Sequence, residues 1–299
     1  MSNMAFNPVP ASQMKIILSR KGFDSTAGGV PSPILPDGRI VSLPIPDPLS
    51  PVRYGEIGGE ERDIGTLVSN LTGGRIRRNS RGHLDPDLIA ADRPRPPAWQ
   101  PIFGQEGAAQ GHLRNRGVGP GDVFVFFGLF QQTRWHRGRL VFDSRAPRQH
   151  LIWGWMQVDR VVPVADCPDD IRGWAADHPH LHHDGNRNNV LYLARDRLTG
   201  FGTKAPLPGS GVFSRYRRAL RLTRRGSPRP TLWRVPTWLH PGPGRAALSY
   251  HEHPGRWQTH QGITQLQSAF RGQEFVLSTR DYPASVAWLG GLIRRQVHA

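Results

Sequence analysis

Apolar runs alternate with polar, turn-rich segments along the chain, and they predict the strands of one sheet. Residues 123–127, 151–158 and 190–194 are nearly continuous apolar runs rich in aromatic and β-branched side chains. Such runs are typical of central strands. A shorter run at 15–19 predicts a strand at the start of the fold. We therefore expect a central sheet built largely from the middle of the chain.

Three segments have the composition and spacing of helices. Residues 63–71 predict a short helix, 107–115 a helix with small residues that allow close packing, and 284–296 a helix with one apolar side. Strands and helices are interspersed without a regular βαβ rhythm. The pattern therefore favours an α+β fold with a mixed or mainly antiparallel sheet. Seven prolines between residues 31 and 51 predict extended loop or edge strand, in keeping with long Gly/Pro-rich loops.

The chain carries no long linker, so residues 14–299 are expected to form a single domain. Residues 1–13 are interpreted as a disordered extension, and they lack the pattern of a signal peptide. No apolar run approaches the roughly 20 residues that cross a bilayer, which excludes a membrane protein. The single cysteine, Cys167, excludes an internal disulfide and a cysteine-based zinc site. These features favour a cytoplasmic location.

The charge balance changes the picture more than the apolar content does. The chain has 39 basic and 23 acidic residues, which gives a formal net charge of +16. A surplus of this size favours polyanion binding through counterion release, with a merely solvated basic surface as the alternative. The densest charge lies at 215–225, where six arginines surround Tyr216. We predict that the partner is DNA or a nucleotide.

The first candidate site is the Gly-rich turn that follows the first predicted strand. Backbone N–H groups of such a turn bind phosphate, and glycines allow its close approach. Lys21 supplies a cation, while Asp24 and Ser25 lie in the same turn ahead of Gly28 and Gly29. The alternative is a tight turn in which Asp24 or Ser25 caps its neighbours.

The second candidate is the segment 83–87, which contains His83, Asp85 and Asp87. In an extended chain, residues two apart point to the same side, so these side chains are placed to work together in acid–base chemistry. The His-x-Asp pair also resembles half of a two-histidine, one-carboxylate iron site, with His112 or His251 as a possible third ligand. The spacing is weak evidence, so we assign no metal ligand. A polar loop is the alternative.

The third candidate is the segment 104–113. The amides of Gln105 and Gln110 are able to read a base edge, and His112 ends the same segment. Small residues between them leave room for a flat ligand against the backbone. The alternative is a helix with a packed alanine face and solvated Gln and His side chains.

The fourth candidate is the histidine-rich run 177–184. A zinc or nickel site is one interpretation, but Pro179 and the absence of helical spacing weaken it. Histidine runs exposed to solvent are the alternative. The pair His178 and His180, just before the strand at 190–194, is the more interesting part of the run.

The fifth candidate is carboxy-terminal and combines acid–base, phosphate-binding and stacking residues. Glu274 and His251 suit acid–base chemistry, arginines suit a phosphate clamp, and a tryptophan offers a stacking face for a base. Core packing is the alternative for the tryptophan, and a salt-bridged turn for the Arg-Gly-Gln-Glu run. The remaining members of this group are Arg256, Trp257, Arg271 and Gln273.

Taken in order, these segments resemble a known family, the bacterial and phage proteins called nucleotide modification associated domain, third type. The resemblance spans residue 14 to about residue 293 and implies a role in DNA base modification without naming a reaction. The middle of the chain is also similar to modified-base reader barrels of the PUA and EVE type. The family resemblance rests on residues 19–29, 83–87, 104–113, 121–128, 152–155, 178–180 and 271–276.

These patterns lead to a hypothesis with two alternatives. The leading hypothesis is an enzyme acting on a base or nucleotide in DNA, with the cofactor unspecified. It assigns catalysis to the polar core of Asp24, His83, Asp85, His112, His251 and Glu274. The first alternative is a non-catalytic reader whose aromatic cage includes Trp153, Trp155 or Trp257. The second alternative is a small-molecule hydrolase or metal enzyme with an incidental basic surface.

Overall fold

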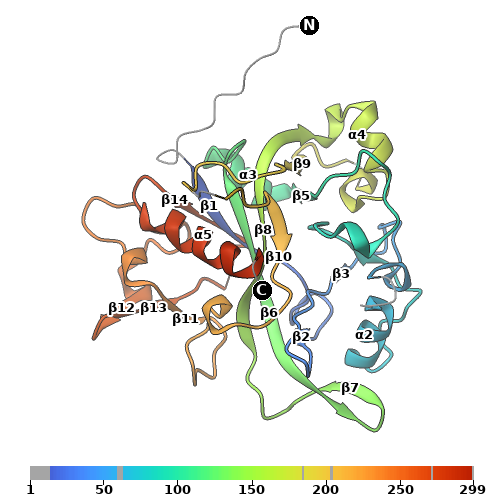
Figure 1. Ribbon diagram of the computed structural model, residues 1–299, viewed down its shortest axis with the longest axis horizontal. Coiled ribbons are helices and arrows are strands. Elements are labelled where there is room, and N and C mark those ends of the chain that lie inside the picture. Colours follow the sequence, from blue (N-terminus) through green and yellow to red (C-terminus); the bar gives the residue numbers. More distant parts are fainter. Residues whose placement is uncertain (1–13, 59–62, 184, 203–204, 271, 298–299) are drawn as a thin grey trace, which may run out of the picture.

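The computed structural model describes residues 14–58, 63–183, 185–202, 205–270 and 272–297, and its centre is a nine-stranded mixed sheet (Figure 1). The main path through the sheet is β14-β1-β6-β8-β9-β5, with β2 and β7 paired to β6 and β10 paired to β8. The strands are β1 (Lys15–Arg20), β2 (Ser32–Ile34), β5 (Ile102–Glu106), β6 (Val123–His136), β7 (Arg139–Phe142), β8 (Gln149–Pro163), β9 (Asn189–Ala194), β10 (Ser210–Val212) and β14 (Glu274–Ser278).

The expected central sheet is confirmed, and it is mainly antiparallel. Only the pairs β1–β6 and β2–β6 are parallel in the described part of the chain. The long strand β6 is buried from Val123 to Gln131, which explains its continuous apolar sequence, because both of its faces are covered. Beyond Gln131 its exposed and buried residues begin to alternate, and it runs well past the predicted end at residue 127.

The sheet does not close into a barrel. Among the described residues its two end strands, β14 and β5, do not pair with each other. Helix α3 (Gly107–Asn115) instead contacts both of them. The expectation of a PUA- or EVE-like barrel in the middle of the chain is therefore not met, because a helix rather than a strand pairing joins the two ends of the sheet.

The three predicted helices are present, and a fourth was not predicted. Helix α2 (Ile64–Leu71) begins after Asp63, whose side chain accepts the N–H of Thr66. Helix α5 (Ala284–Val297) crosses in front of the sheet in Figure 1, and its buried leucines and isoleucine join the main core. The unpredicted helix is α4 (Asp169–Trp174). Short 3-10 helices are η1 (Tyr54–Glu56), η2 (Ala90–Asp92), η3 (Val164–Asp166), η4 (Pro179–His182), η5 (Arg218–Leu220), η6 (Thr237–Leu239) and η7 (Pro254–Arg256).

Two smaller sheets flank the large one. The proline-rich stretch at 31–51 contributes β2 and then β3, as expected for edge strands. One small sheet has the order β11-β13-β12 and the other pairs β3 with β4. Their strands are β3 (Ile45–Pro46), β4 (Gly82–His83), β11 (Leu232–Val235), β12 (Trp257–His260) and β13 (Ile263–Gln267).

The buried apolar residues form three clusters. The largest follows the central sheet and α5, the second packs α2 against the segment around Val52 and Tyr54, and the third covers α4. No helix among the described residues is long and apolar enough to cross a membrane. Residues 1–13, for which the sequence predicted a disordered extension, lie outside the described residues.

Candidate metal centre

A cluster of histidines and carboxylates lies where four segments meet: the end of β3, strand β4 with the loop after it, the end of β5, and helix η4. Neutral imidazoles and carboxylates together are the donor set of many sites for first-row transition metals. The cluster comprises Asp47, His83, Asp85, Glu106, His178, His180 and His183.

Backbone pairing brings the members of the cluster together. In the β3–β4 pair Ile45 lies opposite His83, which places Asp47 beside His83. The loop after β4 is then fixed to the central sheet, because the N–H of Gly104 in β5 donates to Oδ1 of Asp85 at 2.7 Å. The segments around β3 and β4 thus meet strand β5 of the central sheet.

Three side chains of the cluster direct one ligand atom each toward a common point. Nε2 of His83 is 3.9 Å from Oδ2 of Asp85, and Nε2 of His180 is 3.8 Å from the same oxygen. The three atoms lie within 4.8 Å of one another. Ligand atoms about 2.0–2.1 Å from one ion are roughly 2.9 Å apart in octahedral and 3.4 Å apart in tetrahedral geometry. An approach of about 0.5–1 Å by each imidazole nitrogen toward Oδ2 of Asp85, and of no more than about 2 Å between the two nitrogens, would therefore enclose an ion. We call His83, Asp85 and His180 the inner triad.

The outer nitrogen of each imidazole in the inner triad is held by an acceptor. Nδ1 of His83 donates to Oδ2 of Asp47 at 2.8 Å, and Nδ1 of His180 donates to Oδ1 of Asn189 at 2.7 Å. Because both partners are oxygen acceptors, each Nδ1 carries a hydrogen, which leaves each Nε2 as the nitrogen that faces Asp85. This is the arrangement that orients histidine ligands in metal sites.

Burial and local charge set the protonation of the triad. The side chains of Asp85 and His180 are each 4% exposed. Burial lowers the pKa of His180 to about 3, against an opposing pull from Asp85, so its imidazole is neutral. Burial alone raises the pKa of Asp85, but a hydrogen bond from His178 and the neighbouring imidazoles outweigh it and shift this pKa downward. In the triad His180 is therefore a neutral imidazole and Asp85 a carboxylate, and His83 adds a second imidazole.

An outer group shares His83 with the inner triad. Nε2 of His183 lies 2.9 Å from Oδ2 of Asp47, and its Nδ1 lies 3.4 Å from Oε1 of Glu106. These short separations are hydrogen-bond lengths, so the outer group already uses its ligand atoms to hold His83 and His183. The inner triad is the better candidate for a metal.

The two histidines that the sequence offered as a third ligand lie elsewhere. Nε2 of His112 is 3.0 Å from the hydroxyl of Ser249, and its ring packs on Tyr250. His251 is fully buried, where it donates from Nδ1 to the carbonyl of Ser249 and accepts the N–H of Ala269 at Nε2. Burial lowers the pKa of His251 to about 4. In this structure the third candidate ligand, beside His83 and Asp85, is His180.

A second polar network surrounds Glu274 at the start of β14. Its Oε1 accepts hydrogen bonds from Ser19 (3.0 Å), Lys21 (2.8 Å) and Gln105 (2.6 Å). Its Oε2 is buried and has no hydrogen-bond partner among the described residues. Gln105 follows Gly104 in β5, and since neighbouring residues of a strand face opposite sides, the network and the triad lie on opposite faces of this strand.

Comparison with known proteins identifies the family. The family model described as nucleotide modification associated domain 3 matches residues 15–278 of the 299-residue chain. The chain belongs to this family. No curated protein and no solved structure matches it.

In this family member, the segments that carried the resemblance gather around the two polar groups. The turn after β1 supplies Lys21, the loop after β4 supplies His83 and Asp85, and β5 supplies Gln105. Helix η4 adds His180. Five of the seven motif segments thus supply side chains to these two groups, and the other two, 121–128 and 152–155, lie largely in β6 and in β8.

The remaining residues proposed from the sequence lie in turns, in the core or outside the described residues. Asp24 accepts the N–H groups of Thr26 and Ala27 and so caps its own turn, in which Ser25 is exposed. The indole of Trp257 is 6% exposed and donates to a backbone carbonyl, so neither of its faces is open for stacking. Gln110 accepts the hydroxyl of Tyr192, Arg256 donates to the carbonyl of Gln267, the carbonyl of Gln273 accepts the N–H of Arg20, and Arg271 lies outside the described residues.

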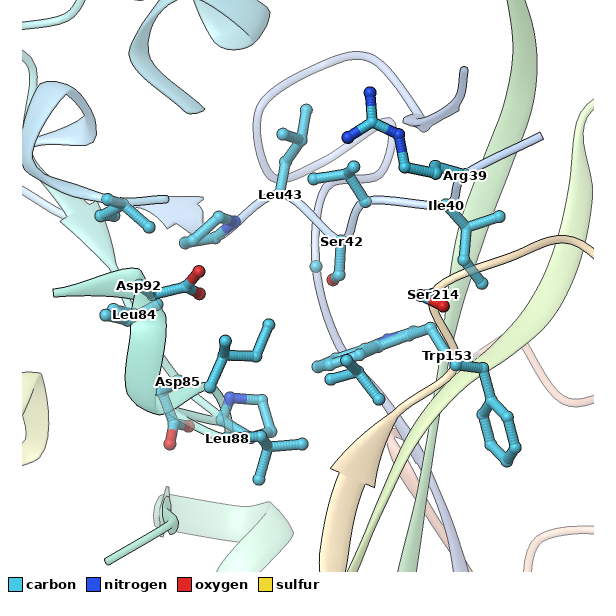
Figure 2. A pocket seen from close by; sticks show the side chains of 18 residues that line it. Arg39, Ile40, Ser42, Leu43, Leu84, Asp85, Leu88, Asp92, Trp153 and Ser214 are labelled. Carbon is cyan, nitrogen blue, oxygen red and sulfur yellow. The ribbon is translucent and has the colours of Figure 1, made fainter. Parts of the chain in front are cut away.

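A mostly apolar pocket of about 240 Å³ lies beside the loop that carries Asp85. Figure 2 shows the carboxylate of Asp92 directed into this pocket, the indole of Trp153 on the opposite side, and the carboxylate of Asp85 turned away from it. Trp153 is the member of the expected aromatic cage that lines the pocket. Trp155 is buried, with its N–H bonded to the carbonyl of Pro208.

Sequence reasoning missed the supporting residues and left His180 unassigned. Asp47 lies in a proline-rich stretch, and Asn189 is the first residue of a strand, so neither carries a motif. The available signal was the combination of His83-x-Asp85 with the later His-Pro-His run, which the sequence analysis treated as two separate sites.

Proposed function

We propose that this chain is a metal-dependent enzyme that modifies a nucleotide or nucleobase, with His83, Asp85 and His180 as the metal ligands. The observation that carries the proposal is the inner triad, whose imidazoles turn their free nitrogens toward one carboxylate oxygen while acceptors fix their other nitrogens. Membership of a family described as nucleotide modification associated supports the choice of a nucleotide or nucleobase as the substrate.

The donor set defines what the metal does. Two imidazoles and one carboxylate would hold a divalent ion and leave coordination positions free for other ligands. This set fits iron(II), which supports oxidation of a base, and zinc(II), which supports hydrolytic chemistry. Asp47 and Asn189 position the two histidines.

Metal binding by the full chain tests the proposal. Protein stripped with a chelator is titrated under anaerobic conditions with iron(II), cobalt(II) or zinc(II), and the bound metal is measured by calorimetry and elemental analysis. We expect one ion per chain, with loss of at least about 100-fold in affinity for H83A, D85A and H180A, because each removes a ligand. The matched control is H182A, which changes an exposed histidine of the same short helix.

Two outcomes decide where the ion lies and whether the proposal stands. If H183A abolishes binding while H180A does not, the ion occupies the outer group and the inner triad is the wrong assignment. If the wild-type chain binds none of the three metals, the metal-dependent function is overturned. Nucleoside mass spectrometry on DNA and nucleotides incubated with loaded protein then identifies the product.

A reader of modified bases is the second candidate function, and the pocket beside Trp153 is the observation that favours it. Its volume is below the about 300 Å³ at which pockets for drug-sized ligands begin, which suits a single planar base better than a whole nucleotide. A reader binds modified DNA in chelator without turnover, and W153A weakens that binding. Turnover that requires the inner triad favours the enzyme.

A further inference from the structure

Four arginines surround a groove of about 510 Å³ on the side of the protein formed by η5 and the small sheet β11-β13-β12. We call it the arginine groove. Its lining also includes Ile263 at the start of β13 and Trp288 of α5. No carboxylate lines it among the described residues. The four arginines are Arg218, Arg221, Arg225 and Arg234.

Within the described residues the guanidinium groups of these four arginines form no ion pair and no hydrogen bond. Arg215 and Arg217 of the same basic segment instead donate to backbone carbonyls, which separates their role from that of the groove. Seven other arginines do pair with carboxylates: Arg39, Arg78, Arg93, Arg95, Arg116, Arg145 and Arg195.

The backbone holds these arginines in place. The N–H of Arg234 in β11 donates to the carbonyl of Leu222 at 2.8 Å, and Arg221 forms an isolated bridge with Leu151 of the long strand β8. Four like charges around one groove favour the binding of anions there.

We infer that the arginine groove binds the phosphodiester backbone of a nucleic acid strand. Planar guanidinium groups are suited to phosphate, and four unpaired ones along one groove match successive phosphates rather than the single phosphate cluster of a free nucleotide. The net charge of +16 also favours the binding of a polyanion. The substrate of the proposed modification is then a base within a polymer. This inference rests on the groove and not on the metal centre.

Salt-dependent DNA binding tests the groove. Fluorescence anisotropy with a short labelled duplex is measured between about 50 and 200 mM salt. Chelator is present throughout, so that the result is independent of the metal centre. Each phosphate contact contributes about 0.9 to the slope of log K against log salt, so replacing all four arginines by glutamine should lower the slope by about 3.6. Each single replacement should lower it by about 0.9.

A charge-matched variant separates the groove from the overall charge. It replaces four exposed arginines that do not line the groove, namely Arg134, Arg137 and Arg139 of the β6–β7 hairpin and Arg160 of β8. The hairpin lies well away from β11 in Figure 1. The inference is overturned if this control lowers the slope as much as the groove variant does, or if the groove variant keeps the wild-type slope. It is also overturned if a mononucleotide displaces the duplex from the groove at equal phosphate concentration. Circular dichroism and metal binding confirm that both variants are folded.

Discussion

Gly104→Ala is the sharpest single perturbation of the proposed metal centre. Gly104 lies in β5 beside the inner triad, and its backbone N–H holds Asp85. An added Cβ would lie 2.2 Å from Cδ2 and 2.4 Å from Cγ of the imidazole of His180. Gly104 is not one of the glycines with positive φ, so alanine fits its backbone conformation and the effect is steric.

The size of the effect follows from these distances. Carbon atoms pack at about 3.5–4.0 Å, so the ring of His180 must move by roughly 1.3 Å or more. A functional site tolerates displacements of only about 0.5 Å, and disturbing the orientation of a ligand usually costs about 10- to 100-fold in metal affinity. Overpacking a buried site also lowers the free energy of unfolding by about 1–3 kcal/mol.

The assay is metal titration of G104A together with urea unfolding of the metal-free protein. G173A is the matched control, because no described atom lies within 4 Å of a Cβ added at Gly173 in α4. It should bind metal like the wild type. A second variant, N189A, frees the ring of His180 without a clash and should lower affinity about 10- to 100-fold. Wild-type affinity in both G104A and N189A would refute His180 as a ligand.

Three further predictions concern stability. R95A leaves the buried carboxylate of Asp87 without its bidentate partner and should lower the free energy of unfolding by about 3 kcal/mol in urea titrations. Burial lowers the pKa of His150 to about 3, so below pH 6.5 the unfolded chain binds a proton at this residue and the folded chain does not. The free energy of unfolding therefore falls as the pH falls. In the wild type this decrease in the free energy of unfolding amounts to up to about 1.4 kcal/mol per pH unit between pH 6 and 4, and it should be absent in H150Q. E274Q leaves the ammonium group of Lys21, whose side chain is 11% exposed, without its carboxylate partner. K21M/E274Q removes that unpaired charge and should be more stable than E274Q alone.

Each of these predictions has a comparison that decides it. R145A removes a guanidinium that is 87% exposed, so its stability should stay within about 0.5 kcal/mol of the wild type; equal losses in R95A and R145A would contradict the role of burial. Identical pH slopes for H150Q and wild type would show that His150 is protonated in the folded chain. A double variant no more stable than E274Q would mean that Lys21 and Glu274 are not coupled.

Much of the fold could be predicted from local pattern. The apolar runs at 123–127, 151–158 and 190–194 became β6, β8 and β9, since an unbroken apolar run needs a strand covered on both faces. Whether the sheet closes into a barrel could not be predicted, because that depends on which elements meet at the two ends of the sheet. The barrel expectation failed there, where α3 contacts both β5 and β14.

The candidate site shows the same division. The sequence by itself determined the donors, through His83-x-Asp85 and the His-Pro-His run, and it determined the family and the basic surface. Only the tertiary structure decided that His180 rather than His112 or His251 joins the pair, because β5 carries Gly104 between Asp85 and the ring of His180. Likewise, local charge marked the segment 215–225, but only the fold sorted its arginines into those bound to carbonyls and those left facing a groove. Sequence sets which groups are present, whereas their partners are set by long-range packing that brings distant segments within bonding distance.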